Sequence, residues 1–167
     1  WSSDVCSSDL IFLGEVTNWK ELGGKDQKIV ILNRAAGSGT RATFEKWVLG
    51  DKTAIRAQEQ DSSGMVRSIV SDTPGAISYT AFSYVTDEVA TLSIDGVQPT
   101  DENVMNNKWI IWSYEHMYTR KNPSDLTKEF LDFMLSDDIQ ERVIGQLGYI
   151  PVSKMEIERD WQGNVIK

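Results

Sequence analysis

The segment from Lys28 to Gly50 combines three features that strongly restrict the fold. Lys28 to Leu32 is a nearly continuous apolar run, which is typical of a short strand buried on both faces. A glycine-containing loop follows at 33–37. Phe44, Trp47 and Val48 then recur at helical spacing, and Gly50 stands where a helix would stop, so the pattern predicts a helix over about 38–49. The loop therefore connects the end of a buried strand to the start of a helix.

The following elements continue this alternation. Ser62 or Ser63 is a suitable cap for a short amphipathic helix, and Pro74-Gly75 would end it. The segments 76–79 and 89–95 have the composition of strands. Strands and helices that alternate at such short spacing predict an α/β layer fold.

The character of the chain changes at Trp109, where an aromatic-rich segment predicts extended structure over 109–114. Two helices are expected after Pro123, and Gly148 would end the second. Apolar side chains mark one face of each helix: Leu126, Phe130, Phe133 and Met134 on the first, and Ile139, Val143, Ile144 and Leu147 on the second. Such faces normally pack against a core.

Composition excludes several classes of function. Seventeen basic and 25 acidic residues give a net charge of -8, which argues against a nucleic-acid or anionic-membrane surface. No stretch approaches the ~20 apolar residues that span a bilayer. The single cysteine, Cys6, excludes an internal disulfide framework and a CxxC metal site, and no spacing of ligands predicts a metal or another cofactor. Residues 1–10 (WSSDVCSSDL) follow no structural period, and we expect them to be non-native or disordered.

The loop NRAAGSGTRATFE (33–45) favours anion binding. The first N–H groups of a helix that begins with Ser38-Gly39-Thr40 would point at a ligand with a partial positive charge. Ser38 and Thr40 add hydroxyl groups, Gly39 allows close approach, and Arg34 adds a planar, charged fork. The simpler alternative is that Ser38 caps the helix and Arg34 is solvated. A helix N-terminus disfavours a cation, however, unless an anion joins it.

Two further alternatives concern enzymes. Gly37 to Ala42 satisfies the dinucleotide pattern G-x-G-x-x-G/A, but four residues separate the apolar run from the first glycine, and no convincing strand ends in an acidic residue about 20 positions later. Glu59 and Asp61 are near that distance but lie in a polar stretch. A nucleophilic role for Ser38 would need a base, and the only histidine is His116, in the aromatic segment.

Four segments together resemble the phosphate-binding proteins of high-affinity phosphate ABC transporters. They are Ile11 to Trp19, Asn33 to Arg41, Pro74 to Tyr79 and Leu147 to Val152. The resemblance spans residues 11–155, and the order of the segments is more specific than any one of them. It implies a periplasmic-binding-protein-like α/β fold with two lobes, a hinge, and a phosphate ion bound between the lobes.

The resemblance also implies specific positions and boundaries. Arg34, Ser38, Gly39 and Thr40 match the phosphate-binding motif of the second lobe. Many members have an acidic residue that orients the arginine at the position of Ala36. The loops of the first lobe have no counterpart here, so the chain is expected to be a fragment. Residues 11–108 would form the second lobe. Residues 109–167 would cross back, with helices that pack on the missing first lobe.

The expected function is therefore non-enzymatic. The protein would bind inorganic phosphate outside the cytoplasmic membrane, at the cell surface or in the periplasm, and deliver it to the permease subunits of an ABC importer. It would act as a monomer, with membrane attachment only through a lipid anchor of the parent protein. A binding protein for another tetrahedral oxyanion, such as sulfate or molybdate, and an enzyme that uses the Gly37–Ala42 loop remain the alternatives.

Overall fold

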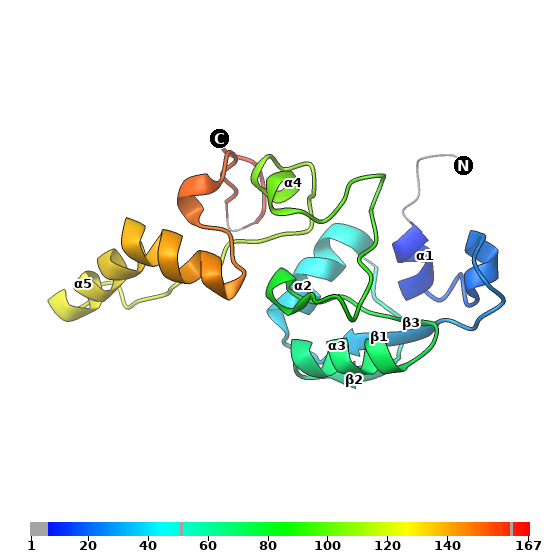
Figure 1. Cartoon of the computed structure of the whole chain (residues 1–167). Coiled ribbons are helices and arrows are strands. Elements are labelled where there is room, and N and C mark those ends of the chain that lie inside the picture. Colours follow the sequence, from blue (N-terminus) through cyan, green and yellow to red (C-terminus); the bar gives the residue numbers. More distant parts are fainter. Residues whose placement is uncertain (1–6, 51, 161) are drawn as a thin grey trace.

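The computed structural model describes residues 7–50, 52–160 and 162–167. Its order of elements confirms the predicted alternation of helices and strands in the first part of the chain (Figure 1). The α-helices and strands are α1 (Ser7–Phe12), β1 (Val30–Arg34), α2 (Gly39–Phe44), β2 (Gln58–Gln60), α3 (Ser63–Asp72), β3 (Ala76–Ile77), α4 (Asp101–Met105) and α5 (Asp125–Met134). The 3-10 and π segments are η1 (Trp19–Leu22), η2 (Glu45–Leu49), η3 (Phe82–Tyr84), η4 (Asp138–Ile144), η5 (Gly145–Leu147) and η6 (Val152–Lys154).

The three strands form a parallel sheet in the order β2-β1-β3. Arg34 of β1 lies opposite Gln60 of β2, and Ile31 lies opposite Ile77 of β3. β1 is therefore central, which explains its apolar composition. Parallel neighbours require crossover connections, and the segments that contain α2 and α3 provide them. The observed α/β layers confirm the predicted fold class.

The helix that follows the loop is close to the predicted one. Ser38 is its N-cap, α2 continues directly into the π-helical turn η2, and Gly50 follows with φ 61°. α3 likewise begins after a serine cap, Ser62, as expected. These helix ends were predictable because a side-chain cap and a glycine in the left-handed region are local features.

The main core lies between the sheet, the α2–η2 helix and α1. Its buried members are Ile11, Phe12, Ile29, Phe44, Leu49, Ala54 and Ile77. The rings of Phe12 and Phe44 meet edge to face at a centroid distance of 4.7 Å. Gly75 has φ +81°, and a Cβ there would lie 2.4 Å from the carbonyl oxygen of Lys28, so β3 can approach β1 only with glycine at this position.

Residues 7–10 belong to the segment that was expected to be non-native or disordered. They form the start of α1, with Asp9 in its first turn, where negative charge is favourable. Ile11 and Phe12 on the same helix are each only 1% exposed, so core packing orders the turn that precedes them. The part of that prediction concerning residues 1–6, Cys6 included, lies outside the described residues.

The predicted strand over 89–95 is wrong, because these residues form loop structure. Instead of joining the sheet, Ile94 pairs with Val97 in an isolated antiparallel bridge. Both pack on a second buried cluster made of Val104, Trp109 and Trp112. The aromatic segment that begins at Trp109 has no regular secondary structure, and its two tryptophans supply most of this cluster.

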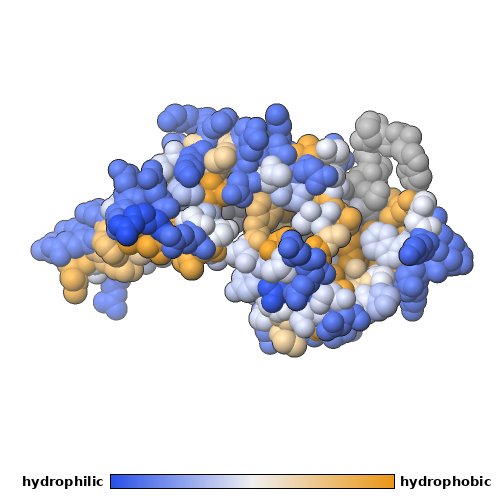
Figure 2. Space-filling view, viewed as in Figure 1, coloured by the Kyte–Doolittle hydropathy of each residue, from blue (hydrophilic) through white to orange (hydrophobic). Residues whose placement is uncertain are grey.

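The two late helical segments appear where they were predicted, but the apolar face of α5 is uncovered. α5 projects away from the sheet (Figure 1), and Figure 2 shows hydrophobic residues along this projecting part of the molecule. Leu126 is 75% exposed, Phe130 55% and Phe133 54%. Ile139 of η4 is buried, whereas Leu147 of η5 is exposed. The expected apolar face exists, but within the described chain little packs against it.

Candidate functional site

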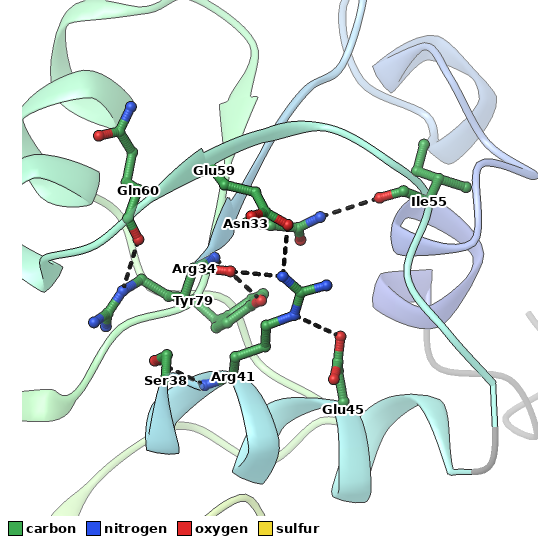
Figure 3. A network of polar contacts seen from close by, with 9 residues as sticks. All are labelled: Asn33, Arg34, Ser38, Arg41, Glu45, Ile55, Glu59, Gln60 and Tyr79. Atoms are coloured by element: carbon green, nitrogen blue, oxygen red, sulfur yellow. Dashed lines mark hydrogen bonds and ion pairs between the residues drawn. The ribbon is translucent and has the colours of Figure 1, made fainter. Parts of the chain in front are cut away.

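The predicted anion loop lies at the carboxyl end of the central strand. β1 ends at Arg34 and α2 begins at Gly39. Gly37 has φ +86°, a left-handed conformation that glycine adopts without strain and that turns the chain into the helix. The Oγ of Ser38 accepts a hydrogen bond from the backbone N–H of Arg41 at 3.3 Å, so this serine is the helix cap (Figure 3).

The guanidinium of Arg34 is held at each of its three nitrogens. Nε donates to the carbonyl oxygen of Gln60 at 3.3 Å, and Nη2 donates to that of Asp61 at 2.7 Å. Nη1 donates to the hydroxyl of Ser63 at 2.6 Å. These bonds use three of the five N–H groups of the guanidinium, which leaves two for another acceptor. The arginine is thus oriented but not saturated.

Arg34 is also a buried charge without a counter-ion in the described chain. Its exposed fraction is 8%. All three of its acceptors are neutral, and none of the ion pairs among residues 7–50, 52–160 and 162–167 includes it. A buried cation is costly unless an opposite charge compensates it. This position therefore favours a bound anion, and the alternative that Arg34 is a solvated surface residue is wrong.

Arg41, in α2, has the opposite environment. Nε lies 2.8 Å from a carboxylate oxygen of Glu45, and Nη1 lies 2.7 Å from one of Glu59 (Figure 3). The hydrogen bonds to Glu45 and Glu59 raise the pKa of Arg41 above its already high value. The charge of Arg41 is thus neutralised within the protein, and its pair with Glu59 of β2 connects α2 to the sheet. We therefore assign Arg41 a structural role.

The backbone at the end of β1 is fixed by two polar side chains. The hydroxyl of Tyr79 accepts from the backbone N–H of Arg34 at 3.3 Å, and its ring stacks on Phe44 at a centroid distance of 4.0 Å. Asn33 is 1% exposed and donates from Nδ2 to the carbonyl oxygen of Ile55 at 3.1 Å. Burial raises the pKa of Tyr79 above its usual 10.0, so the hydroxyl also stays neutral at alkaline pH where a free phenol would begin to ionise. The backbone from which the loop starts is thus held in place.

The four predicted anion-site residues line one broad depression of the surface: Arg34, Ser38, Gly39 and Thr40. A Cβ built on Gly39 would meet no atom within 4 Å, so the space beside the first helical turn is open. The N–H groups of Gly39 and Thr40 lie in that turn, where a helix supplies no acceptor of its own. Residues of the aromatic segment, Trp112 to Tyr118, line the same depression.

The partners of Arg34 were not identified from the sequence. Gln60 belongs to β2, a polar strand of three residues that no hydrophobic pattern marks. A short strand therefore lies in this polar stretch, but it ends in Gln60 and not in an acidic residue, as the sequence argument expected. Glu59 is nevertheless engaged by Arg41, which weakens its similarity to the acidic residue of a dinucleotide site. Only the parallel register seen in the structure places Gln60 opposite Arg34, and the sequence contains no signal for it.

The geometry gives no support to a nucleophilic Ser38. Its hydroxyl caps α2, and no hydrogen bond in the described chain joins it to His116, whose ring instead lies 6.4 Å from that of Tyr114. Among the described residues, no group of three or more His, Cys, Asp and Glu side chains is arranged to hold a metal ion. Nor does any helix among them have the length and apolar character required to cross a membrane.

Comparisons with known proteins match the chain to a family model and to relatives described as phosphate-binding proteins. A family model described as a PBP superfamily domain matches residues 4–138. The phosphate-binding protein PstS of Bacillus subtilis (strain 168) is 50% identical over 163 residues, which are 96% of this chain and 54% of that protein. PstS of Borreliella burgdorferi is 31% identical over 85% of this chain and 55% of its own length. The chain therefore spans about half the length of these curated relatives.

Solved structures agree with these sequence matches. A Clostridium perfringens protein, described as a substrate-binding protein of a phosphate ABC transporter and solved with bound phosphate, superimposes with a TM-score of 0.75 at 36% identity. The match covers 87% of this chain and 61% of that one. An ABC-type phosphate transport receptor from Vibrio cholerae gives a TM-score of 0.69 at 27% identity, over 86% of this chain and 61% of its own. Because the family model covers well over half of its residues, the chain belongs to the family of PBP superfamily domains.

Proposed function

We propose that this chain carries half of a phosphate-binding site, in the solute-binding subunit of an ABC importer. Arg34, Ser38, Gly39 and Thr40 would hold the anion. The observation that carries the proposal is Arg34, a guanidinium that is 8% exposed and bonded only to neutral groups, beside the start of α2. The relatives described as phosphate-binding proteins support phosphate as the anion.

The donors in the depression suit a tetrahedral anion. The guanidinium retains two N–H groups, and charge-assisted hydrogen bonds of this kind contribute roughly 1.5 to 3 kcal/mol each. The N–H groups of Gly39 and Thr40 add the partial positive charge of a helix start. Hydroxyl groups of Ser38 and Thr40 complete a set of donors from a single loop.

The wider role follows the same relatives. We propose that the whole protein works outside the cytoplasmic membrane as a monomer, with or without a lipid anchor, and presents phosphate to permease subunits. Residues 11–108 would form one lobe. Residues 109–167 would cross to another lobe and pack α5 and η4 against it. The uncovered apolar face of α5 supports this division, because such faces normally pack against a core.

The expected affinity of the chain alone is low. The best small ligands gain about 1.5 kcal/mol per heavy atom, so phosphate, with about five, reaches roughly 7.5 kcal/mol in a complete site, which corresponds to a dissociation constant of ~3 μM. A site with donors from one lobe should bind far more weakly. We expect a millimolar dissociation constant for this chain.

A second candidate is a site for another tetrahedral oxyanion. Hydrogen phosphate is distinguished from sulfate by its proton, which needs an acceptor such as a carboxylate. The loop residues that follow Arg34 and line the depression include no acidic residue, so these donors alone should not distinguish the two anions. The chain should therefore bind phosphate and sulfate with similar affinity.

Titration of the ¹⁵N-labelled chain with phosphate, sulfate and NAD tests the proposal by NMR. Phosphate and sulfate should shift the amide signals of Ser38, Gly39 and Thr40 at millimolar concentration, whereas NAD should shift them only through its phosphates. Absence of any phosphate-induced shift at these amides would contradict the proposal. Micromolar phosphate binding would refute the claim that half of the donors are missing.

A further inference from the structure

Two consecutive serines at the start of α3 have different partners. The Oγ of Ser62 accepts from the backbone N–H of Met65 at 3.1 Å and caps the helix. Ser63 is the first helical residue and is only 7% exposed. Its hydroxyl accepts from Nη1 of Arg34 at 2.6 Å, and this bond is buried. The cap is thus complete without Ser63, and the side chain of Ser63 is turned to the arginine.

Among the three acceptors of Arg34, Ser63 is the one that a substitution can remove. The other two are backbone carbonyl oxygens, of Gln60 and Asp61. The carbonyl of Gln60 is shared, because it also accepts from the backbone N–H of Ala35 at 2.9 Å. The three acceptors contact three different nitrogens, and together they fix both the direction and the plane of the guanidinium. Without the hydroxyl, Nη1 would have no described acceptor and the plane could turn.

We propose that Ser63 is a positioning residue for anion binding. Its hydroxyl holds the guanidinium of Arg34 so that the two remaining N–H groups face the ligand. This inference rests on the proposed anion site. Position 36, within the loop itself, is an alanine and offers no side-chain acceptor, so the one side-chain acceptor that orients the arginine comes from α3. Because the hydroxyl is neutral, it orients the cation without supplying a negative charge that would compete with the ligand.

The test compares three variants in phosphate titrations followed at the amides of Gly39 and Thr40. Ser63→Ala removes the acceptor and should weaken phosphate binding ~10-fold, the effect of losing one hydrogen bond to a charged group. Ser63→Thr keeps a hydroxyl and should restore binding to within ~3-fold of the unmodified chain. Ser62→Ala is the matched control. It removes the adjacent cap, lowers the thermal midpoint, and should change phosphate affinity less than ~2-fold.

A second measurement does not need phosphate. The Nε–H signal of Arg34 in the ligand-free chain reports how firmly the guanidinium is held, and it should broaden or exchange faster in Ser63→Ala but not in Ser62→Ala. Ser63→Ala with affinity within ~2-fold of the unmodified chain, or with an unchanged Arg34 signal, would overturn the positioning role. Arg34→Met separates the two claims: if this variant still binds phosphate normally, the proposed function itself fails.

Discussion

Nη1 of Arg41 donates a hydrogen bond to the backbone carbonyl oxygen of Arg34 at 2.8 Å. Arg34 of β1 and Arg41 of α2 are thus directly linked, yet only the charge of Arg41 is neutralised by other side chains. Arg41 is neutralised by Glu45 and Glu59, whereas Arg34 meets only neutral acceptors in the described chain. We infer that Arg41 stabilises the structure around the loop and that Arg34 binds the ligand.

Substitution of Arg41 should therefore reduce stability. Arg41→Met leaves Glu45 and Glu59 without their partner and frees the carbonyl of Arg34, so we expect the free energy of unfolding to fall by about 1–2 kcal/mol. Urea denaturation measures this. Arg142→Met is the matched control, because Arg142 and Asp138 form a pair with side chains 77% and 63% exposed, and its loss should cost less than about 0.5 kcal/mol. Equal effects of the two substitutions would contradict the structural role of Arg41.

The raised pKa of Tyr79 predicts that the free energy of unfolding changes with pH in the alkaline range. Burial raises its pKa in the folded state above the usual 10.0, so the folded chain keeps the phenolic proton at a pH where the unfolded chain has lost it. Above pH ~10 the unfolded state binds fewer protons, and the contribution of Tyr79 to stability falls as the pH rises.

The measurement is the free energy of unfolding of the unmodified chain minus that of Tyr79→Phe, from pH 8 upward. The difference should be positive below pH ~10 and shrink above it. Tyr118→Phe is the control, since Tyr118 is 86% exposed, and it should leave the pH profile of the unmodified chain unchanged. A Tyr79→Phe difference that grows with pH would show that the sign is wrong.

The loop was predictable because its determinants are local. The cap Ser38, the glycine at 50 and the helical spacing of Phe44, Trp47 and Val48 all act within a few residues, and the structure places the strand and helix within about two residues of the predicted bounds. The four residues predicted to bind an anion line one depression, and their role in binding stays a prediction.

What the sequence did not reveal depends on distant partners. β2 is a polar segment that becomes a strand only because β1 offers it an edge. Residues 89–95 have a strand-like composition, but Ile94 turns to the cluster of Val104, Trp109 and Trp112 instead. The acceptors of Arg34 include two backbone carbonyls, which have no signature in the sequence.

A third prediction concerns Arg159, which attaches the last residues to the rest of the chain. Its Cζ lies 4.2 Å from the ring centroid of Trp47 and 3.9 Å from that of Trp112. Nη1 donates to the carbonyl oxygens of Ile110 at 3.0 Å and Trp112 at 2.9 Å. Burial lowers the pKa of Arg159 to about 10, so it is still a cation at neutral pH and can bind both rings.

Arg159→Met should loosen the segment 156–167 without disturbing the sheet. Cation–π pairs contribute about 0.5–2 kcal/mol each, so amide protection of Ile166, which donates to the carbonyl of Glu158 at 2.9 Å, should fall by at least ~10-fold in hydrogen exchange. Lys167→Met is the control, because the pair of Lys167 and Glu158 is exposed. Unchanged protection in Arg159→Met would exclude this attachment.

The uncovered face of α5 leads to the fourth prediction. Leu126 and Phe130 are more than half exposed, so the double substitution Leu126→Gln, Phe130→Gln should change the free energy of unfolding by less than about 0.5 kcal/mol. It should reduce concentration-dependent association in sedimentation experiments, since the apolar face is lost. Lys128→Gln, at an exposed site of the same helix, is the control. A loss of several kcal/mol would mean that this face is already packed within the chain.

The central claim is that Arg34 is a cation held in position to bind an anion, and substitution of Arg34 tests this most directly. The measurement is the phosphate dissociation constant of Arg34→Met against that of the unmodified chain, from titrations followed at Gly39 and Thr40. Because the buried charge has no counter-ion in the described chain, its removal should leave the protein folded and weaken phosphate binding by at least ~100-fold, an effect of about 3 kcal/mol. An Arg34→Met chain that folds and binds phosphate as tightly as the unmodified chain would contradict the account.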